Sequence, residues 1–329
     1  MNAAAAPSIG PATTAPLVRE GVRGAGRNAL LRVCAEWRDR DPRDAVVLSC
    51  EPRGGSTWLG EVLAAAEPTA VVWEPLHLTR APEVAEAGFG WRQFIPADAD
   101  WPEATALMRR ILTGRTLNGW TASASPFRAF LSADRLMVKF CRANALLPWL
   151  VRRFAFRRKP IYFLRHPFAI AASQLGMGNF GTERMERSLV SGRFSELRAA
   201  DAAYIRTLGT DAERIVALWC LANRPPLEDA EAGSLWVRMH YEDLIRRPER
   251  EMERLFAAWG GTAPAVVLDR VRKASRMTQA GSLRGDPEAQ LWKWRDVFDP
   301  TQRRDLERVL ERFGLHAYDG DVYPAEPAA

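Results

Sequence analysis

Residues 44–63, DAVVLSCEPRGGSTWLGEVL, contain the pattern that decides the fold. An apolar run of strand length ends in a turn with one proline and two glycines, and a helical pattern follows. Ser56 or Thr57 stands where the N-cap of that helix is expected. Such a unit directs backbone N–H groups and the positive end of a helix toward one point, which suits an anion. Similar turns join many strands to helices for geometric reasons alone, so a structural role remains equally open.

The composition indicates one large domain. The chain has 329 residues, of which 47% are hydrophobic, enough to bury a sizeable core. We expect a disordered leader at residues 1–20, which lacks the basic and continuous apolar regions of a signal peptide. A single domain should follow at 21–320, with an insertion at about 79–135 and a tail at 321–329. No stretch of the sequence is long and apolar enough to span a membrane, so we expect no membrane insertion.

The basic residues are mostly arginine. The net charge is +6, and only four of the 46 basic residues are lysine. Arginine binds phosphate and sulfate in a bidentate manner, although a genome-wide bias in base composition is the better explanation of most of this preference. The basic cluster at residues 152–159 lacks the interleaved aromatic residues of a nucleic-acid platform, so no nucleic-acid partner is expected.

The cysteines are scattered. Cys34, Cys50, Cys141 and Cys220 show no C-x-x-C spacing, which argues against a metal site and against a disulfide framework. We therefore expect no bound metal and a reducing, cytoplasmic location.

Apolar runs of strand length alternate with helical patterns along the chain. Besides the strand that ends at Cys50, strands are expected at 69–73, 136–141, 160–164 and 235–241. Helices are expected, among others, at 102–113, 168–175, 195–208, 211–222 and 264–274. The alternation predicts an α/β fold with a parallel sheet and helices on both faces. A polar loop is expected at 275–290 and a mobile loop at 176–195, and the insertion either shapes a substrate pocket or caps the structure.

Charged residues follow or interrupt several of these strands. Glu74 comes directly after the second strand, Lys139 is the lone charge in the third, and Arg165 follows the fourth. Because parallel strands end at the same edge of a sheet, we expect these residues near the glycine turn. That turn lacks both the spacing and the lysine of a G-x-x-x-x-G-K-[ST] motif, which predicts a phosphate held by arginine and hydroxyl groups rather than by lysine and metal.

Four segments resemble motifs of the sulfotransferases that use 3′-phosphoadenosine-5′-phosphosulfate (PAPS). Residues 52–59, PRGGSTWL, resemble the family's 5′-phosphosulfate loop, and residues 165–173, RHPFAIAAS, are similar to its 3′-phosphate element. YEDL at 241–244 with Pro248 resembles its YEDL-x₃-P segment, and LRG at 283–285 resembles its C-terminal R-x-G loop. The four segments occur in the family's order, and together they imply the P-loop-like sulfotransferase fold.

The resemblance also implies a site for PAPS and for its product PAP. The 5′-phosphosulfate would be held by Arg53, Gly54, Gly55, Ser56 and Thr57. The 3′-phosphate would be held by Arg165 and Ser173, with Arg284 and Gly285 closing over it. Trp58 and Tyr241 are positioned like the family's adenine contacts, or are simply core aromatics, and Ser275 is a weaker candidate for a further contact.

The general base is the position at which this family varies. Its aryl and steroid members carry K-T-H where this chain has Lys139-Phe140-Cys141, so their catalytic histidine is absent here. Residues 73–77, WEPLH, instead resemble the E-P-L segment of the carbohydrate sulfotransferases, in which a carboxylate is the expected base. Glu74 is the first candidate for the base and His77 the second. The alternatives are that Glu74 only caps the end of the strand and that His77 is an ordinary loop histidine. Lys139, and Arg142 just after it, would face the sulfuryl group or pair with Glu74.

The sequence therefore predicts a sulfotransferase that moves the sulfuryl group of PAPS to a hydroxyl of a small molecule or a carbohydrate. The alternatives are a nucleotide-dependent phosphotransferase and a non-catalytic nucleotide-binding module. A homodimer remains an alternative to a monomer.

Overall fold

The fold is built on five parallel strands. The computed structural model describes residue 26, residues 28–31, residue 33 and residues 38–178, 180–189, 192–280 and 288–325, with only the backbone described at 273–280. Within these residues the strands are β1 (Val46–Cys50), β2 (Thr69–Trp73), β3 (Arg135–Phe140), β4 (Ile161–Leu164) and β5 (Val237–His240). They pair in the order β2-β3-β1-β4-β5, and every pairing is parallel. The parallel-sheet α/β fold that the sequence predicts is confirmed.

Strand β1 lies at the centre of the sheet, where the order of the strands reverses. Leu48 of β1 is aligned with Lys139 of β3 on one side and with Ile161 of β4 on the other. The chain therefore leaves β3 and crosses β1 to reach β4, which makes this a topological switch point. We call the edge at which the strands end the carboxyl edge of the sheet. In α/β proteins, ligands bind outside this edge at the switch point.

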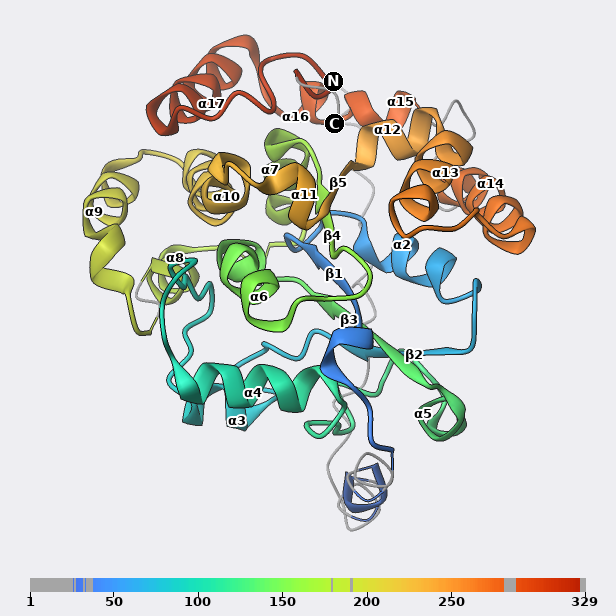
Figure 1. Cartoon of the computed structure of the whole chain (residues 1–329). Coiled ribbons are helices and arrows are strands. Elements are labelled where there is room, and N and C mark those ends of the chain that lie inside the picture. The colour runs from blue at the N-terminus through green and yellow to red at the C-terminus, as the bar shows by residue number, and fades with distance from the viewer. Residues whose placement is uncertain are drawn as a thin grey trace, which may run out of the picture.

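Helices cover both faces of the sheet, as the sequence predicts. Figure 1 shows α2 (Ser56–Leu63), α13 (Pro248–Ala258) and α14 (Ala265–Ala280) on one side. On the other side lie α4 (Pro102–Leu112), α6 (Leu147–Phe154) and α10 (Asp211–Glu228).

The remaining helices are shorter or lie at the periphery. They are α3 (Pro82–Glu86), α5 (Phe127–Ser132), α7 (Pro167–Leu175), α8 (Thr182–Leu189), α9 (Ala199–Thr207), α11 (Ala232–Leu235), α12 (Tyr241–Arg246), α15 (Ala289–Trp292), α16 (Trp294–Val297) and α17 (Pro300–Phe313). Short 3₁₀ turns occur at η1 (Pro42–Asp44), η2 (Asn144–Leu146) and η3 (Ser195–Arg198).

The alternation of side chains along β1 divides the core between the two faces. Val46 and Leu48 pack in the same apolar cluster as Leu59 of α2. Val47, one residue out of phase, packs in the cluster that contains Leu150 of α6. All five side chains are at most 3% exposed, and burying one such side chain stabilises the fold by roughly 1.5–3 kcal/mol. Burial on both faces explains why β1 reads as a continuous apolar run.

Three expected segment boundaries were wrong. The expected loop at 176–195 contains helix α8, because Met185 and Leu189 lie one turn apart and are both buried. Helix α14 reaches Ala280, into the expected polar loop, since neither glycine nor proline interrupts residues 265–280. Helix α10 runs six residues beyond the expected end at 222 and includes two prolines near its end, whose fixed φ is compatible with a helix.

The glycine turn differs from the expectation in its cap. The N-cap of α2 is Gly55, not Ser56 or Thr57, and Gly55 has a left-handed backbone with φ of +87°. A Cβ atom at this position would lie 2.6 Å from Cδ2 of Tyr241. Both the backbone angle and the close approach of the ring therefore require glycine.

We predict that Gly55→Ala lowers the free energy of unfolding by at least about 1 kcal/mol, because alanine is strained at this φ and its Cβ would collide with Tyr241. Gly60→Ala, in the same helix, is the matched control. Its added Cβ would have its nearest neighbours at 3.8 and 3.9 Å, and alanine favours a helix over glycine by about 0.5–1 kcal/mol. Urea unfolding measures both, and equal effects at the two positions would contradict the prediction.

Candidate active site

The structure brings the sequence-predicted charged residues together at the carboxyl edge. Arg53 lies in the turn after β1, Glu74 follows β2, and Arg165 follows β4. Lys139 lies in β3, one residue before its end. These four residues come from four strands that are neighbours in the sheet, so the topology alone gathers them.

One half of the site joins the glycine turn to the segment after β4. Nε of Arg53 donates a hydrogen bond to Oγ of Ser173, at 2.9 Å. Nη1 of Arg165 donates to the backbone oxygen of Arg53, at 2.8 Å. The segments that resemble the 5′-phosphosulfate loop and the 3′-phosphate element therefore touch each other. We call Arg53, Arg165, Ser173, Trp58 and Tyr241 the clamp.

The aromatic rings of the clamp, Trp58 and Tyr241, lie next to Arg165 and to each other. The guanidinium carbon of Arg165 lies 4.6 Å from the centre of the Tyr241 ring. The Tyr241 ring meets the Trp58 ring edge-on, with centroids 6.1 Å apart. Nε of Arg165 and Nε1 of Trp58 are both buried and make no hydrogen bond within the described part of the chain. A bound ligand could supply the missing acceptors, although the core residues Trp219 and Trp294 also have an indole N–H without a partner in the described part of the chain.

The backbone of the glycine turn also fits an anion. Helix α2 begins at Ser56, and the first N–H groups of a helix have no acceptor within the helix. Arg53 and Thr57 are exposed, whereas Ser56 is buried, with its Oγ 4.0 Å from Sγ of Cys141. Gly54 is also buried, and a Cβ there would lie 2.9 Å from the backbone oxygen of Glu51. A side chain at Gly54 would therefore force the turn to shift.

Three of the expected contact residues cannot be placed. Arg284 and Gly285 lie outside the residues that the structure describes, and so does the side chain of Ser275. The contacts of Arg284 and Gly285 with the 3′-phosphate, and the further cofactor contact of Ser275, stay predictions.

The other half of the site is centred on Glu74. Its Oε1 is 3.3 Å from Nζ of Lys139 and accepts from Sγ of Cys141 at 3.1 Å. Its Oε2 is 3.6 Å from Nη1 of Arg142. The expected pairing of Lys139 with Glu74 is thus present in the structure. Oε2 faces a cation at ion-pair distance, while Oε1 is held by two donors.

The electrostatics keep Glu74 ionised. Burial by itself would raise the pKa of this carboxyl group, but the charges of Lys139 and Arg142 and the hydrogen bond from Cys141 bring it below its ordinary value of 4.5. Lys139 is only 2% exposed, and its Nζ lies 3.5 Å from the centre of the Trp73 ring. Burial lowers the pKa of Lys139, but Cys141, Cys50 and Glu74 beside it raise the pKa above its ordinary value, so both partners are charged at neutral pH.

His77 lies near Glu74 in an aromatic setting. Its ring meets those of Trp91 and Trp120 edge-on, with centroids 4.9 and 5.3 Å apart. Its Nδ1 is 3.3 Å from Oγ1 of Thr79. Burial, and then the charge of Arg142, lower the pKa of His77 to about 4. The imidazole is therefore neutral at pH 7.

The site contains residues that sequence reasoning missed. Arg92, from the insertion, forms an ion pair with the buried Glu51, which directly follows β1. Burial, and then repulsion by Arg142 and Arg92, lower the pKa of Arg184 in α8. Only the position of Glu51 at a strand end could have drawn attention to it in the sequence. Arg92 and Arg184 lie in irregularly patterned segments, so nothing local marks them.

Backbone strain gives a further sign of function. Only four non-glycine residues of the described chain have a positive φ, and two of them are Arg53 at +71° and Glu74 at +39°. Left-handed backbone at a residue with a long side chain costs free energy, and such residues are concentrated at functional sites. The two strained residues belong to the two halves of the site.

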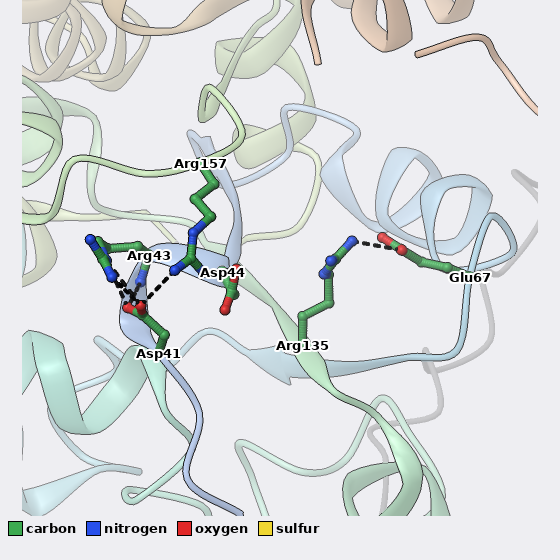
Figure 2. Close-up of polar contacts among 6 residues, drawn as sticks. All are labelled: Asp41, Arg43, Asp44, Glu67, Arg135 and Arg157. Atoms are coloured by element: carbon green, nitrogen blue, oxygen red, sulfur yellow. Dashed lines mark hydrogen bonds and ion pairs between the residues drawn. The ribbon is translucent and has the colours of Figure 1, made fainter. Parts of the chain in front are cut away.

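The opposite edge of the sheet has a different character. Figure 2 shows Arg43 and Arg157 around Asp41, with Nη2 atoms 2.6 and 3.0 Å from its Oδ2. Nη1 of Arg135 lies 2.8 Å from Oε2 of Glu67. Arg43 and Arg157 are exposed and Arg135 is half-buried, and ion pairs at the surface contribute little to stability. Near Glu74, Lys139 is buried and only 13% of the Arg142 side chain is exposed, which is the costlier arrangement.

The YEDL segment has a structural function. Glu242 is buried, and its Oε1 accepts from the backbone N–H of His166 at 3.0 Å. Its Oε2 accepts from the hydroxyl of Tyr318 at 2.8 Å. Glu242 thereby ties α12 to the start of α7, which carries Ser173.

Searches for metal sites and membrane spans found no candidates. No group of three His, Cys, Asp or Glu side chains that could hold a metal ion occurs in the described ranges. None of the described helices combines the length and the apolar character needed to cross a bilayer.

The solved structures that resemble this chain include three sulfotransferases. The sulfotransferase domain from the curacin biosynthetic pathway is 16% identical, with 83% of this chain and 98% of that chain covered and a TM-score of 0.44. The sulfotransferase domain of the Synechococcus PCC 7002 olefin synthase is 20% identical, with coverages of 84% and 95% and a TM-score of 0.43. A mouse sulfotransferase complexed with PAP is 14% identical, with coverages of 86% and 87% and a TM-score of 0.43. No protein-family model and no curated protein matches the sequence.

The Glu74 environment predicts a pH-dependent contribution to stability. Because the pKa of Glu74 is lowered by folding, its ionised form stabilises the folded chain above the unfolded-state pKa, and this stability is lost as the pH falls through the folded-state pKa. Glu74→Gln should therefore destabilise the protein at pH 7, and its difference from wild type should shrink on acidification. Urea unfolding from about pH 7 down to about pH 3 measures this. Glu86→Gln, at an exposed position of α3, controls for the loss of one negative charge. A difference between Glu74→Gln and wild type that does not change with pH would contradict the lowered pKa of Glu74.

Proposed function

We propose that the protein transfers the sulfuryl group of PAPS to a hydroxyl group of a small-molecule or carbohydrate acceptor and releases PAP. The observation that carries this proposal is the direct contact of Arg53 with Ser173. That contact joins the two motif-bearing turns on the same edge as Glu74 and Lys139. An arginine-based phosphate site and an ionised carboxylate at one sheet edge fit a group transfer to a hydroxyl.

The clamp residues fit a nucleotide with two anionic groups. Arg53, the turn glycines and the start of α2 would hold the 5′ group, and Arg165 with Ser173 would hold the 3′-phosphate. Trp58 and Tyr241 offer aromatic surface for a base. The buried donors without partners, Nε of Arg165 and Nε1 of Trp58, support this fit.

PAPS, when bound, supplies an activated sulfuryl group whose departure leaves negative charge on the 5′-phosphate. Arg53 and the N–H groups of the turn are placed to stabilise such charge. Lys139 and Arg142 add fixed positive charge on the side of Glu74. These cations are held by ion pairs and aromatic rings, so they need little reorganisation.

Glu74 is the better candidate for the base. The acceptor hydroxyl must lose its proton as its oxygen bonds to sulfur, and a carboxylate within hydrogen-bond reach can take it. Oε1 of Glu74 already accepts from Lys139 and Cys141, which leaves Oε2 for a hydroxyl. His77 is neutral at pH 7 and remains the second candidate.

The acceptor is expected near His77. Trp91 and Trp120 flank this histidine, and Arg142 lies over the Trp91 ring at 4.9 Å. Aromatic faces bind both sugar rings and phenols, which fits either class of acceptor. We further propose a cytoplasmic location, since Cys50, Cys141 and Cys220 are free thiols.

A thermal-shift experiment that compares metal-free PAP with ATP·Mg²⁺ tests the proposed function. PAP should raise the melting temperature of the protein more than ATP·Mg²⁺ does, because the clamp uses arginine in place of a Walker lysine and metal. Stronger stabilisation by ATP·Mg²⁺ would favour a phosphotransferase. PAP binding without sulfate transfer to any acceptor in a broad ³⁵S-PAPS screen would favour a non-catalytic binding module.

Arg53→Ala and Arg165→Ala should each weaken PAP binding by about 10- to 100-fold, because each removes charge-assisted hydrogen bonds to phosphate. Isothermal titration calorimetry measures the affinity. Arg157→Ala is the matched control, since this exposed arginine pairs with Asp41 and Asp44 at the opposite edge (Figure 2). Unchanged affinity in either clamp variant would refute the placement of PAP.

Glu74→Gln should lower turnover by about 100-fold or more while PAP still binds, because glutamine cannot accept the proton. His77→Gln should lower it less. The pH dependence of kcat/KM should show no inflection near 6.5, since the pKa of Glu74 is lowered and that of His77 is about 4. Near-normal turnover in Glu74→Gln with a large loss in His77→Gln would reassign the base.

A further inference from the structure

Two cysteines form a pair next to Glu74. Cys50 ends β1 and Cys141 follows β3. The register aligns Ser49 with Phe140, so the next residues of the two chains, Cys50 and Cys141, are also neighbours. Their Sγ atoms are 3.8 Å apart, and both are free thiols. Cys50 is fully buried and Cys141 is 5% exposed.

The pair is linked to the proposed base. Sγ of Cys141 donates to Oε1 of Glu74 at 3.1 Å and accepts from Nζ of Lys139 at 3.4 Å. Sγ of Cys50 is 3.3 Å from the backbone oxygen of Phe140. Glu74 borders solvent, with 19% of its side chain exposed, so a small molecule in the site lies close to Cys141.

Cys50 differs from an ordinary buried cysteine, whereas the hydrogen bond with Cys50, and then burial, raise the pKa of Cys141 well above its ordinary value. Burial raises the pKa of Cys220, which stands alone in the core. For Cys50, burial acts in the same direction, but the hydrogen bond with Cys141 and the charge of Lys139 bring its pKa below the ordinary value. A thiol that ionises more readily, beside a second thiol, is the arrangement found in reactive cysteine pairs.

We propose that Cys50 and Cys141 form a reversible disulfide when the protein meets a hydroperoxide, and that this disulfide stops turnover. The second part rests on the proposed function, whereas the first does not. The pair is thus a site of reversible oxidative modification at the carboxyl edge.

The geometry permits this bond. The two sulfur atoms must approach from 3.8 Å to about 2.0 Å, which side-chain rotation can supply. Neighbouring strands lie about 4.8 Å apart, and disulfides join Cα atoms about 4.4–6.8 Å apart, so the strands need not separate.

The chemistry balances with hydrogen peroxide as the oxidant. One thiolate attacks a peroxide oxygen, the O–O bond breaks, and a sulfenic acid and water result. The second thiol then attacks the sulfenic sulfur, the S–O bond breaks, and a second water leaves with the thiol proton. Both sulfurs are oxidised and both peroxide oxygens are reduced to water. A dithiol reverses the change by thiol–disulfide exchange.

The disulfide would disturb Glu74 directly. Cys141 would lose the hydrogen that it donates to Oε1, and its sulfur would move toward Cys50 and away from Lys139. Cys50 also lies three residues before Arg53, so the bond would fix the start of the glycine turn. Both halves of the site would change together.

Peptide mapping of the oxidised wild-type protein tests the first part. The protein is treated with hydrogen peroxide, alkylated without reduction, digested and analysed by mass spectrometry. We expect a cross-linked peptide pair containing Cys50 and Cys141, which disappears after dithiothreitol. Oxidation confined to Cys34 or Cys220, or stable sulfinic acid without the cross-link, would overturn the proposal.

Turnover with PAPS, measured before and after oxidation, tests the second part. Turnover should fall at least about tenfold on oxidation and return with dithiothreitol. Cys220→Ser should still form the cross-link, whereas Cys141→Ala should give a Cys50 sulfenic acid that dimedone traps. A mapped cross-link with unchanged turnover would overturn the inhibitory role. No turnover even in the reduced protein would count against the proposed function, while the mapping result would stand independently.

Discussion

The parallel pairing of β1 with β3 on one side and β4 on the other is the constraint on which the rest of the structure depends. It places the glycine turn between the ends of two strands that carry Lys139 and Arg165. Because β1 is buried on both faces, a slip of its register by one residue would move every side chain into the core of the opposite face, where it does not fit. The positions of the charged groups at the carboxyl edge follow from this register.

Much of this arrangement is visible in the sequence. The strand at 69–73 was predicted at its observed bounds, and the other strands within two residues, because apolar runs that end in charged or glycine residues leave little choice. The gathering of Arg53, Glu74 and Arg165 followed from a topological rule about strand ends. The motifs supplied proposed roles for these residues, and the structure supplies their neighbours.

The remaining contacts could not be predicted because they join segments that are distant in the sequence. Arg92 meets Glu51 across 41 residues, and Cys50 meets Cys141 across 91. No local pattern encodes such pairs, since the first depends on how the insertion folds and the second on the pairing of β1 with β3. The N-cap at Gly55 was missed for a related reason: a serine at the turn satisfied the local rule, but Tyr241 decides which residue fits.

The positive φ values of Arg53 and Glu74 have a consequence for the evolution of the chain. Glycine would adopt these backbone angles with less strain, and so would asparagine to a lesser degree. Selection for thermal stability alone would therefore be expected to replace Arg53, whereas the ion pair with the buried Lys139 opposes the loss of Glu74. At Arg53, stability and chemistry favour different residues, and a library screened first for heat tolerance would lose the chemistry of this position before it lost the fold.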